Sequence, residues 1–331
     1  MRIKAKHIFV FSILAISAFF IITIVASISP NLPIAGQKPI FYSNQMRQDL
    51  KATCVKALKQ AKKNIHLVMF GLTDSKIIDV LNEKSKDNLK MKVFFDKRSS
   101  NDLDIKENQR FPMKSKGLMH QKILVIDESL VFIGSANFTM SSLLMHDNLI
   151  IGFKSPQIAK FLTSKTPLYS GTFSSMVGGQ QIDIWLLPDF QNKALTRILQ
   201  LIENASTSIE IAMFTFTHPL LVESLIKAKN RGVKINLAID FHSKNGVSKS
   251  AIDKLKKERI DVFSNRSIKL CHHKYILIDN HILVCGSANW TKAAFTKNYD
   301  CFLILYNLDQ SQKKFMTKLS KTIRLESSLL K

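Results

Sequence analysis

The stretch "CHHKYILIDNHILVCGSANWT", residues 271–291, places a histidine, a lysine, an aspartate and a Gly-Ser-x-Asn group along an apolar run that is typical of β-strands. The stretch "MHQKILVIDESLVFIGSANFT", residues 119–139, repeats these residue types. Both read H-x-K, four residues, D, six residues, G-S-x-N. Six residue types that recur at identical spacing indicate a duplicated functional element rather than two unrelated strands.

The duplication extends well beyond this motif. Residues 65–96 align without a gap on residues 209–240. Each copy carries, in order, an amphipathic helix, a buried strand, a helix, a strand and the two motif strands, which predicts parallel βαβ units and an α/β fold. The expected organisation is an N-terminal segment (1–30), a first repeat (39–162), a linker rich in Ser, Thr and Gly (163–181) and a second repeat (182–331).

The motif spacing brings its polar side chains together. Alternate side chains of an extended strand share a face, so the motif histidine and lysine point the same way. The chain then turns near the aspartate and returns, and the glycine allows a close backbone approach where the serine and asparagine face the same spot. These positions are His120, Lys122, Asp127, Gly134, Ser135 and Asn137 in the first copy and His272, Lys274, Asp279, Gly286, Ser287 and Asn289 in the second.

Two such sets suit chemistry at a phosphodiester. One histidine can attack phosphorus while the other protonates the leaving oxygen from the opposite side, and no metal or cofactor is required. We therefore expect His120, Lys122, His272 and Lys274 to be catalytic. Ser135, Asn137, Ser287 and Asn289 are expected to bind the substrate phosphate, because hydroxyl and amide groups can donate to its oxygens.

The duplicated motif resembles that of the phospholipase D superfamily, over nearly all of residues 39–331. The resemblance implies two similar α/β halves packed as one bilobal unit, a single site at their interface and a phosphohistidine intermediate. It also implies that Asp127 and Asp279 are mainly structural. Family members carry an acidic residue 11 positions after the motif asparagine, which hydrogen-bonds the catalytic imidazole; this position is Asp300 in the second copy but Asn148 in the first.

This departure bears on which histidine attacks. A carboxylate partner raises the basicity of an imidazole more than a neutral amide does. Because the first copy carries Asn148 at this position, we expect His120 to be the less basic histidine, which suits it to donate a proton while His272 attacks. Resemblance to two-copy enzymes favours the opposite assignment, with His120 as the nucleophile.

The N-terminus predicts a membrane segment. Residues 8–29 contain no charged residue, and a bilayer span needs about 20 residues. Arg2, Lys4 and Lys6 precede this run, which favours a cytoplasmic N-terminus with the catalytic part on the non-cytoplasmic side, or a secreted protein if the segment is cleaved. The single transmembrane helix would then precede the two repeats. The four cysteines form no C-x-x-C pair, so neither a zinc site nor a disulfide framework is predicted.

The 48 Lys and Arg against 25 Asp and Glu, a net charge of +23, favour a polyanionic partner. The first expectation is hydrolysis or phosphatidyl transfer on a membrane glycerophospholipid. A nucleic-acid phosphodiesterase of the same superfamily is the alternative, and a catalytically inactive lipid-binding protein is the third. No obligate protein partner is expected. The basic loops at residues 104–117 and 241–251 are expected to rim the site, because they precede the motif strands.

Overall fold

The computed structural model describes residues 29–87, 89–101, 103–266 and 269–330. Leu32–Lys331 form one compact unit. The predicted transmembrane helix falls on residues 1–30, almost all of which lie outside the described part of the chain. Within the described residues, no helix combines the length and the apolar character needed to cross a membrane.

The elements follow the predicted order in both halves. The first half contains β1 (Ile40–Tyr42), the 3₁₀ turn η1 (Asn44–Met46), α2 (Leu50–Lys59), β2 (Asn64–Met69), α3 (Ser75–Lys86), β3 (Lys90–Asp96), the 3₁₀ turn η2 (Glu107–Gln109), β4 (Arg110–Met113), β5 (Lys122–Ile126), β6 (Leu130–Gly134), α4 (Met140–Leu144), β7 (Ile150–Lys154) and α5 (Pro156–Lys165).

The second half repeats this series with additions. It contains β8 (Gly171–Val177), β9 (Gln180–Leu186), α6 (Lys193–Glu203), β10 (Ser208–Met213), α7 (Pro219–Asn230), β11 (Lys234–Ile239), α8 (Phe241–Asn245), α9 (Lys249–Lys257), β12 (Asp261–Asn265), β13 (Lys274–Ile278), β14 (Ile282–Gly286), α10 (Lys292–Thr296), β15 (Cys301–Leu305), α11 (Gln310–Leu325) and β16 (Ser327–Leu329). The helices α8 and α9 have no counterpart in the first half.

Each half is built on one mixed sheet. The strand orders are β1-β7-β6-β5-β2-β3-β4 and β16-β12-β11-β10-β13-β14-β15-β9-β8. The predicted parallel pairs are present, with Ile65 opposite Met91 and Ile209 opposite Ile235. The motif strands β5 and β13 run antiparallel to β2 and β10. The prediction of a two-part α/β fold is therefore confirmed, with mixed rather than purely parallel sheets.

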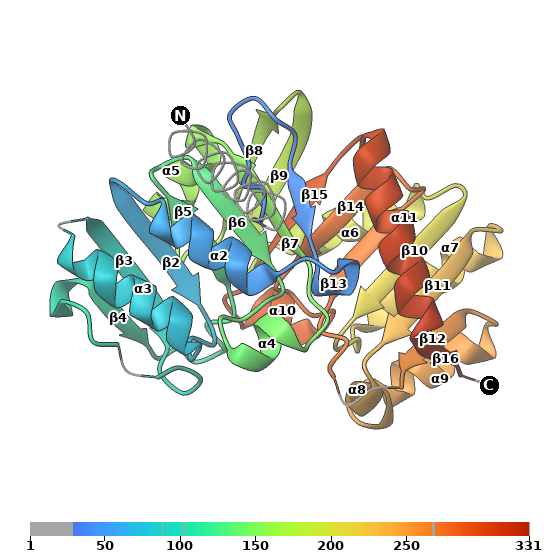
Figure 1. The fold of residues 1–331 in the computed structure, drawn as a ribbon. Helices are drawn as coiled ribbons and strands as arrows, with labels where there is room; N and C mark the ends of the chain where they lie inside the picture. Colours follow the sequence, from blue (N-terminus) through green and yellow to red (C-terminus); the bar gives the residue numbers. More distant parts are fainter. Residues whose placement is uncertain (1–28, 88, 102, 267–268, 331) are drawn as a thin grey trace, which may run out of the picture. The chain divides into compact units, whose positions relative to one another are not determined.

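Three hydrophobic clusters hold these layers together. Helices α2 and α3 cover one face of the first sheet, and α6 and α7 cover the corresponding face of the second (Figure 1). The third cluster joins the two halves, because it draws on strands of both sheets and on α5 and α11. Along β13 the buried side chains alternate between clusters, as the period of a strand requires: Tyr275 and Leu277 face the shared core, Ile276 and Ile278 the outer one.

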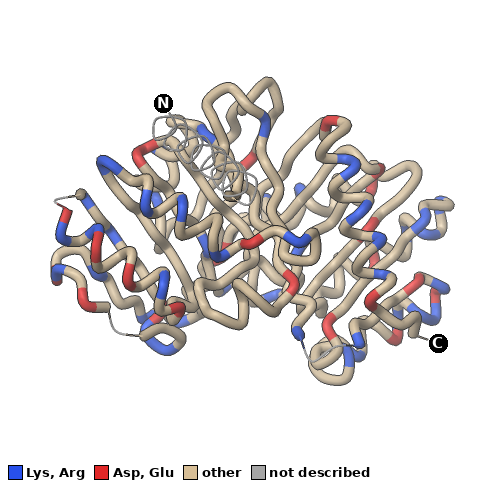
Figure 2. The backbone as a smooth tube through the Cα atoms, in the orientation of Figure 1, with Lys and Arg blue, Asp and Glu red and all other residues tan. Residues whose placement is uncertain are grey.

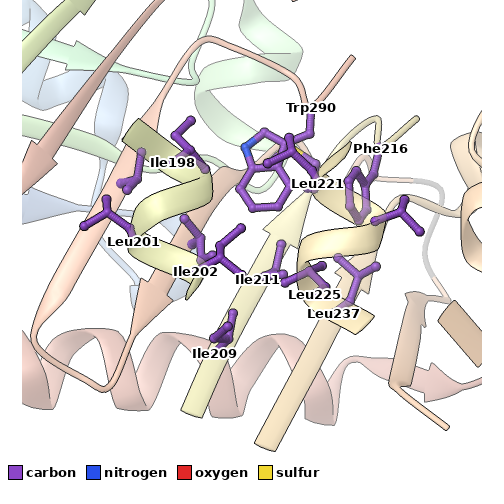
Figure 3. Close-up of a cluster of buried hydrophobic side chains, with 14 of the residues drawn as sticks. Ile198, Leu201, Ile202, Ile209, Ile211, Phe216, Leu221, Leu225, Leu237 and Trp290 are labelled. Carbon is purple, nitrogen blue, oxygen red and sulfur yellow. The ribbon is translucent and has the colours of Figure 1, made fainter. Parts of the chain in front are cut away.

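Figure 3 shows the outer core of the second half. Ile198 and Ile202 of α6 and Leu221 and Leu225 of α7 lie over strands β10 and β11, with their aliphatic side chains packed together. Trp290, the residue after the second motif asparagine, belongs to this cluster and meets Phe216 at 5.2 Å between ring centroids. The motif loop is therefore anchored to the core on the side opposite the shared interface.

The connection between the halves is more ordered than its composition suggests. The predicted linker, residues 163–181, includes the end of α5, all of β8 and the first residues of β9. The strand β8 pairs antiparallel with β9 along its whole length, from Gly171 opposite Leu186 to Val177 opposite Gln180. Exposed residues (Thr172, Ser174 and Met176) alternate in this strand with less exposed ones (Phe173, Ser175 and Val177), a pattern that a compositional argument does not detect.

The two motif aspartates hold turns, as expected. Asp127 accepts hydrogen bonds from the backbone nitrogens of Lys62, Lys63 and Asn64 at 2.7–3.1 Å. Asp279 accepts from the backbone nitrogens of residues 206–208, and from the hydroxyls of Ser206 and Thr207, at 2.7–3.0 Å. Each carboxylate thus ties the turn after a motif strand to the start of the neighbouring strand β2 or β10.

Asp279→Ala is expected to lower the free energy of unfolding by about 1–3 kcal/mol, because several donors lose a charged acceptor. Burial alone would raise the pKa of Asp279, but the hydrogen bonds from residues 206–208 outweigh it and hold this pKa well below its ordinary value. The stabilisation should therefore be present above the unfolded-state pKa of about 3.9 and fade as the pH falls below it.

Urea unfolding of Asp279→Ala at pH 7 and at pH 3 tests this, with the exposed Asp253→Ala as the matched control. The difference in free energy of unfolding between wild type and variant should be smaller at pH 3 than at pH 7 for Asp279→Ala, but not for Asp253→Ala. An equal loss at both pH values would contradict the electrostatic explanation.

Candidate active site

The two halves meet through the segments that precede the catalytic residues. Met119 forms a bridge with Tyr299, and Cys271 forms the equivalent bridge with Asp147. The backbone nitrogen of His120 donates to Tyr299 O at 2.8 Å, and that of Asp147 donates to Leu270 O at 2.9 Å. Each motif histidine is therefore held against the other half of the chain.

This contact crosses the histidine partners between the halves. His120 Nδ1 lies 2.7 Å from Asp300 Oδ1, and His272 Nδ1 lies 2.9 Å from Asn148 Oδ1. The hypothesis that His120 pairs with the amide of its own copy is wrong. His120 has the carboxylate partner, because the halves pack with residues 147–148 against residues 271–272 and residues 299–300 against residues 119–120.

The orientation of the Asn148 amide follows from its other contacts. Its Nδ2 donates to Ser142 O at 2.8 Å and to His146 O at 3.2 Å, so the amide oxygen faces His272. An amide oxygen can only accept, and His272 Nδ1 must therefore carry the hydrogen. The opposite ring nitrogen, Nε2, is left for chemistry.

The motif serines occupy a supporting role instead of the predicted phosphate-binding one. Ser135 Oγ donates to Asn148 Oδ1 at 2.8 Å, and Ser287 Oγ donates to Asp300 Oδ1 at 2.7 Å. Each hydroxyl also accepts a backbone hydrogen bond, from Leu149 or Cys301. Both serines are buried, and their hydrogen bonds position the groups that orient the imidazoles.

The motif lysines keep donors available. Lys122 Nζ donates to His120 O at 2.6 Å and Lys274 Nζ to His272 O at 2.8 Å, and neither ammonium forms a salt bridge with a described residue. Burial lowers the pKa of Lys122 to about 7. Burial and the nearby Lys122 charge also lower the pKa of Lys274 well below its usual range. Two buried lysines whose ammonium forms are disfavoured by burial are suited to bind an anion between them.

The histidines differ in electrostatic environment. Burial lowers the pKa of both rings. Lys122 lowers the pKa of His120 further, but the Asp300 carboxylate offsets part of this shift. The charges around His272, chiefly Lys274 and Lys122, all lower its pKa further. The hydrogen bonds that cross between the halves bring the two motif histidines together, and His120 is the ring with carboxylate support.

The motif asparagines and glycines complete the site. Asn137 Oδ1 accepts from Gly71 N at 3.3 Å, and Asn289 Oδ1 is buried with no hydrogen-bond partner among the described residues. A Cβ at Gly134 would lie 2.3 Å from Leu149 O, and one at Gly286 would lie 2.3 Å from Cys301 O. The two glycines are therefore required by the close passage of the adjoining strand, as the sequence predicted.

Two aromatic residues also belong to the site, although the motif spacing does not reveal them. The rings of Phe70 and Phe214 lie 5.1 Å from those of His120 and His272. The ammonium groups of Lys122 and Lys274 lie 5.2 and 5.0 Å from the same phenylalanine rings. The available signal was the gapless alignment of the halves, in which Phe70 and Phe214 occupy the same position.

Comparison with known families agrees with this geometry. The family model described as "Cardiolipin synthase, PLD-like domain" matches residues 54–165 and 198–323, which is most of the chain. The chain belongs to the phospholipase D superfamily. The two matched segments coincide with the two halves of the fold, and both contain a complete motif.

Individual relatives match over shorter regions. The mitochondrial cardiolipin hydrolase of Mus musculus is 32% identical over 114 residues, 34% of this chain and 50% of that protein. A phospholipase D of Rickettsia felis is 28% identical over 120 residues, 36% of this chain and 60% of that protein. The matched region thus spans about half the length of these relatives of the superfamily.

One solved structure shares the two-half architecture. The phosphatidylserine synthase of Haemophilus influenzae has a TM-score of 0.69 and covers 90% of this chain and 89% of its own. The sequence identity is 14%, so this likeness concerns the phospholipase D fold.

Proposed function

We propose that this protein is a phosphodiesterase that acts on glycerophospholipids, by hydrolysis or by phosphatidyl transfer, through a phosphohistidine intermediate. The observation that carries the proposal is the crossed arrangement of two imidazoles, one held by Asp300 and the other by Asn148, around two buried lysines. Phospholipid as the substrate is supported by the similarity to a cardiolipin hydrolase and a phospholipase D.

In the first step His120 Nε2 attacks phosphorus, and the bond from phosphorus to the leaving oxygen breaks. His272 Nε2 donates its proton to that oxygen, which leaves as an alcohol. The Asp300 carboxylate accepts the Nδ1 hydrogen of His120 and stabilises the positive charge that the phosphorylated ring acquires. Lys122 and Lys274 stabilise the negative charge on the phosphoryl oxygens.

In the second step His272 accepts a proton from water, or from an acceptor alcohol, whose oxygen attacks phosphorus. The bond from phosphorus to His120 breaks, and the ring returns to its neutral form. His272 must be protonated before the first step although its pKa is low in the free protein. When the anionic phosphodiester binds next to the lysines, its negative charge raises the pKa of His272. Substrate and proton therefore bind together.

The full chain, incubated with EDTA, should release headgroup or phosphatidic acid from phosphatidylcholine or cardiolipin vesicles, and His272→Ala should abolish this release. Single-stranded DNA tested in parallel covers the nuclease alternative, to which a net charge of +23 is equally suited. Cleavage of DNA without lipid turnover would overturn the lipid assignment. Turnover of neither substrate would favour an inactive lipid-binding protein.

A further inference from the structure

Exposed apolar side chains gather in the segments next to the catalytic residues. On the short helix α4 and directly after it, Met140 is 66% exposed, Leu144 48% and Met145 58%. Leu118, two residues before His120, and Phe241, the first residue of α8, are also exposed. Large apolar side chains that cluster on a surface usually mark a binding face.

The corresponding surface of the second half is basic. Helix α10 occupies the place of α4, and Lys292 and Lys297 stand at the positions of Met140 and Met145. Both lysines are exposed. The segments 139–146 and 291–298 contain no Asp or Glu, so no acidic side chain within them neutralises the lysines. One half therefore presents an apolar helix and the other a cationic helix.

Both helices are attached to the active site. Ser142 of α4 accepts hydrogen bonds from Asn148, whose oxygen holds His272. Helix α10 lies between Asn289 and Asp300, and its C-terminal cap residue Lys297 is so close to Gly117 that a Cβ on this glycine would lie 2.3 Å from Lys297 O. In Figure 1 both helices lie at the same edge of the two sheets.

The predicted basic loops end at this same edge. The two segments are not simple loops: residues 104–117 contain η2 and β4, and residues 241–251 contain α8 and the start of α9. The first leads into β5, and the second follows β11, whose C-terminal end faces the same way as the start of the motif strands. Lys114 and Lys116 are exposed there. Figure 2 shows Lys and Arg in loops along the lower edge of the view in both halves.

We propose that α4, α10 and the loops around them form a docking face for an anionic phospholipid surface. Met140, Leu144 and Met145 enter the boundary between headgroups and acyl chains, and Lys292 and Lys297 contact lipid phosphates. Amphipathic surfaces of this kind sink about 5–10 Å into that boundary, and anionic lipids attract nearby lysines. The inference rests on the proposed function, because it lets a lipid phosphodiester reach the histidines without leaving the bilayer.

A fluorescent probe can test the depth of this face in the full chain. The four native cysteines are buried, and burial raises the pKa of the Cys54 thiol to about 12, so a thiol reagent should label only an introduced cysteine. Leu144→Cys places an environment-sensitive dye on α4. Met176→Cys, 60% exposed on β8 at a distant edge of the second sheet, is the matched control.

With vesicles of phosphatidylcholine and phosphatidylglycerol, the dye at position 144 should shift its emission to shorter wavelength and be quenched at least two-fold by doxyl-labelled lipid. The dye at position 176 should not respond. Equal behaviour of the two dyes would overturn the docking face. Replacing phosphatidylglycerol with phosphatidylcholine should weaken the quenching, and unchanged quenching would overturn the role of the lysines.

Turnover separates this inference from the proposed function. The double variant Lys292→Glu/Lys297→Glu should lose about ten-fold or more of vesicle turnover but retain cleavage of soluble bis(4-nitrophenyl) phosphate. The exposed pair Lys160→Glu/Lys318→Glu controls for net charge. Equal vesicle turnover in both double variants would overturn the docking face and leave the lipid activity intact. Quenching at position 144 without any lipid turnover would support the docking face and contradict the activity.

Discussion

His120→Ala should abolish turnover, with a loss on the order of 10⁴-fold or more, because the side chain that forms the covalent bond to phosphorus is removed. His272→Ala should show a different defect. Its first step should still proceed with bis(4-nitrophenyl) phosphate, whose leaving group needs no general acid. This variant should release about one equivalent of nitrophenol per site and then stall, because no base activates the water that attacks phosphorus.

Rapid-quench kinetics measure this difference. A comparison of acid-labile with acid-stable phosphate on the protein then shows whether the covalent intermediate has formed. Peptide mapping of the trapped enzyme should locate the phosphate on His120. Phosphate on His272, or a nitrophenol burst in His120→Ala, would reverse the assignment of the two roles. The expected direction follows from the contact between Asp300 and His120, which gives carboxylate support to one ring only.

Asp300→Asn should reduce kcat by roughly 10²–10⁴-fold, since an amide cannot stabilise the charge that His120 acquires. The chain contains its own control, because Asn148 already places an amide beside His272. Asn148→Asp should retain most of the activity. It should also raise the pKa of His272. The alkaline limb of the profile of kcat/KM against pH should then move to higher pH, because the general acid stays protonated to a higher pH.

The profile of kcat/KM against pH for both variants is the decisive measurement. If Asp300 had only a structural role, Asp300→Asn would lower activity without changing the burst amplitude, which reports the rate of the first step relative to the second. Equal losses in Asp300→Asn and Asn148→Asp, with unshifted profiles, would contradict the proposed division of roles.

Sequence reasoning was strongest where local pattern and chemistry coincide. Spacing within one copy predicted the strand that begins at Lys122, the turn held by Asp127 and the close approach at Gly134, whereas His120 lies just before that strand rather than in it. It was weaker for Ser135, because its hydroxyl could donate a hydrogen bond equally well to a substrate or to a neighbouring side chain. In the structure the Ser135 hydroxyl donates to Asn148 Oδ1.

By itself the sequence determined that the chain consists of two copies of one α/β unit, and it identified the histidine and lysine that each copy brings to the shared site. Only the tertiary structure decided which histidine receives the carboxylate. Spacing along one copy places Asp300 at a fixed distance from Asn289, but it carries no information about the partner half. The docking of the halves places Tyr299 against Met119 and Asp147 against Cys271, and so exchanges the partners of the two histidines.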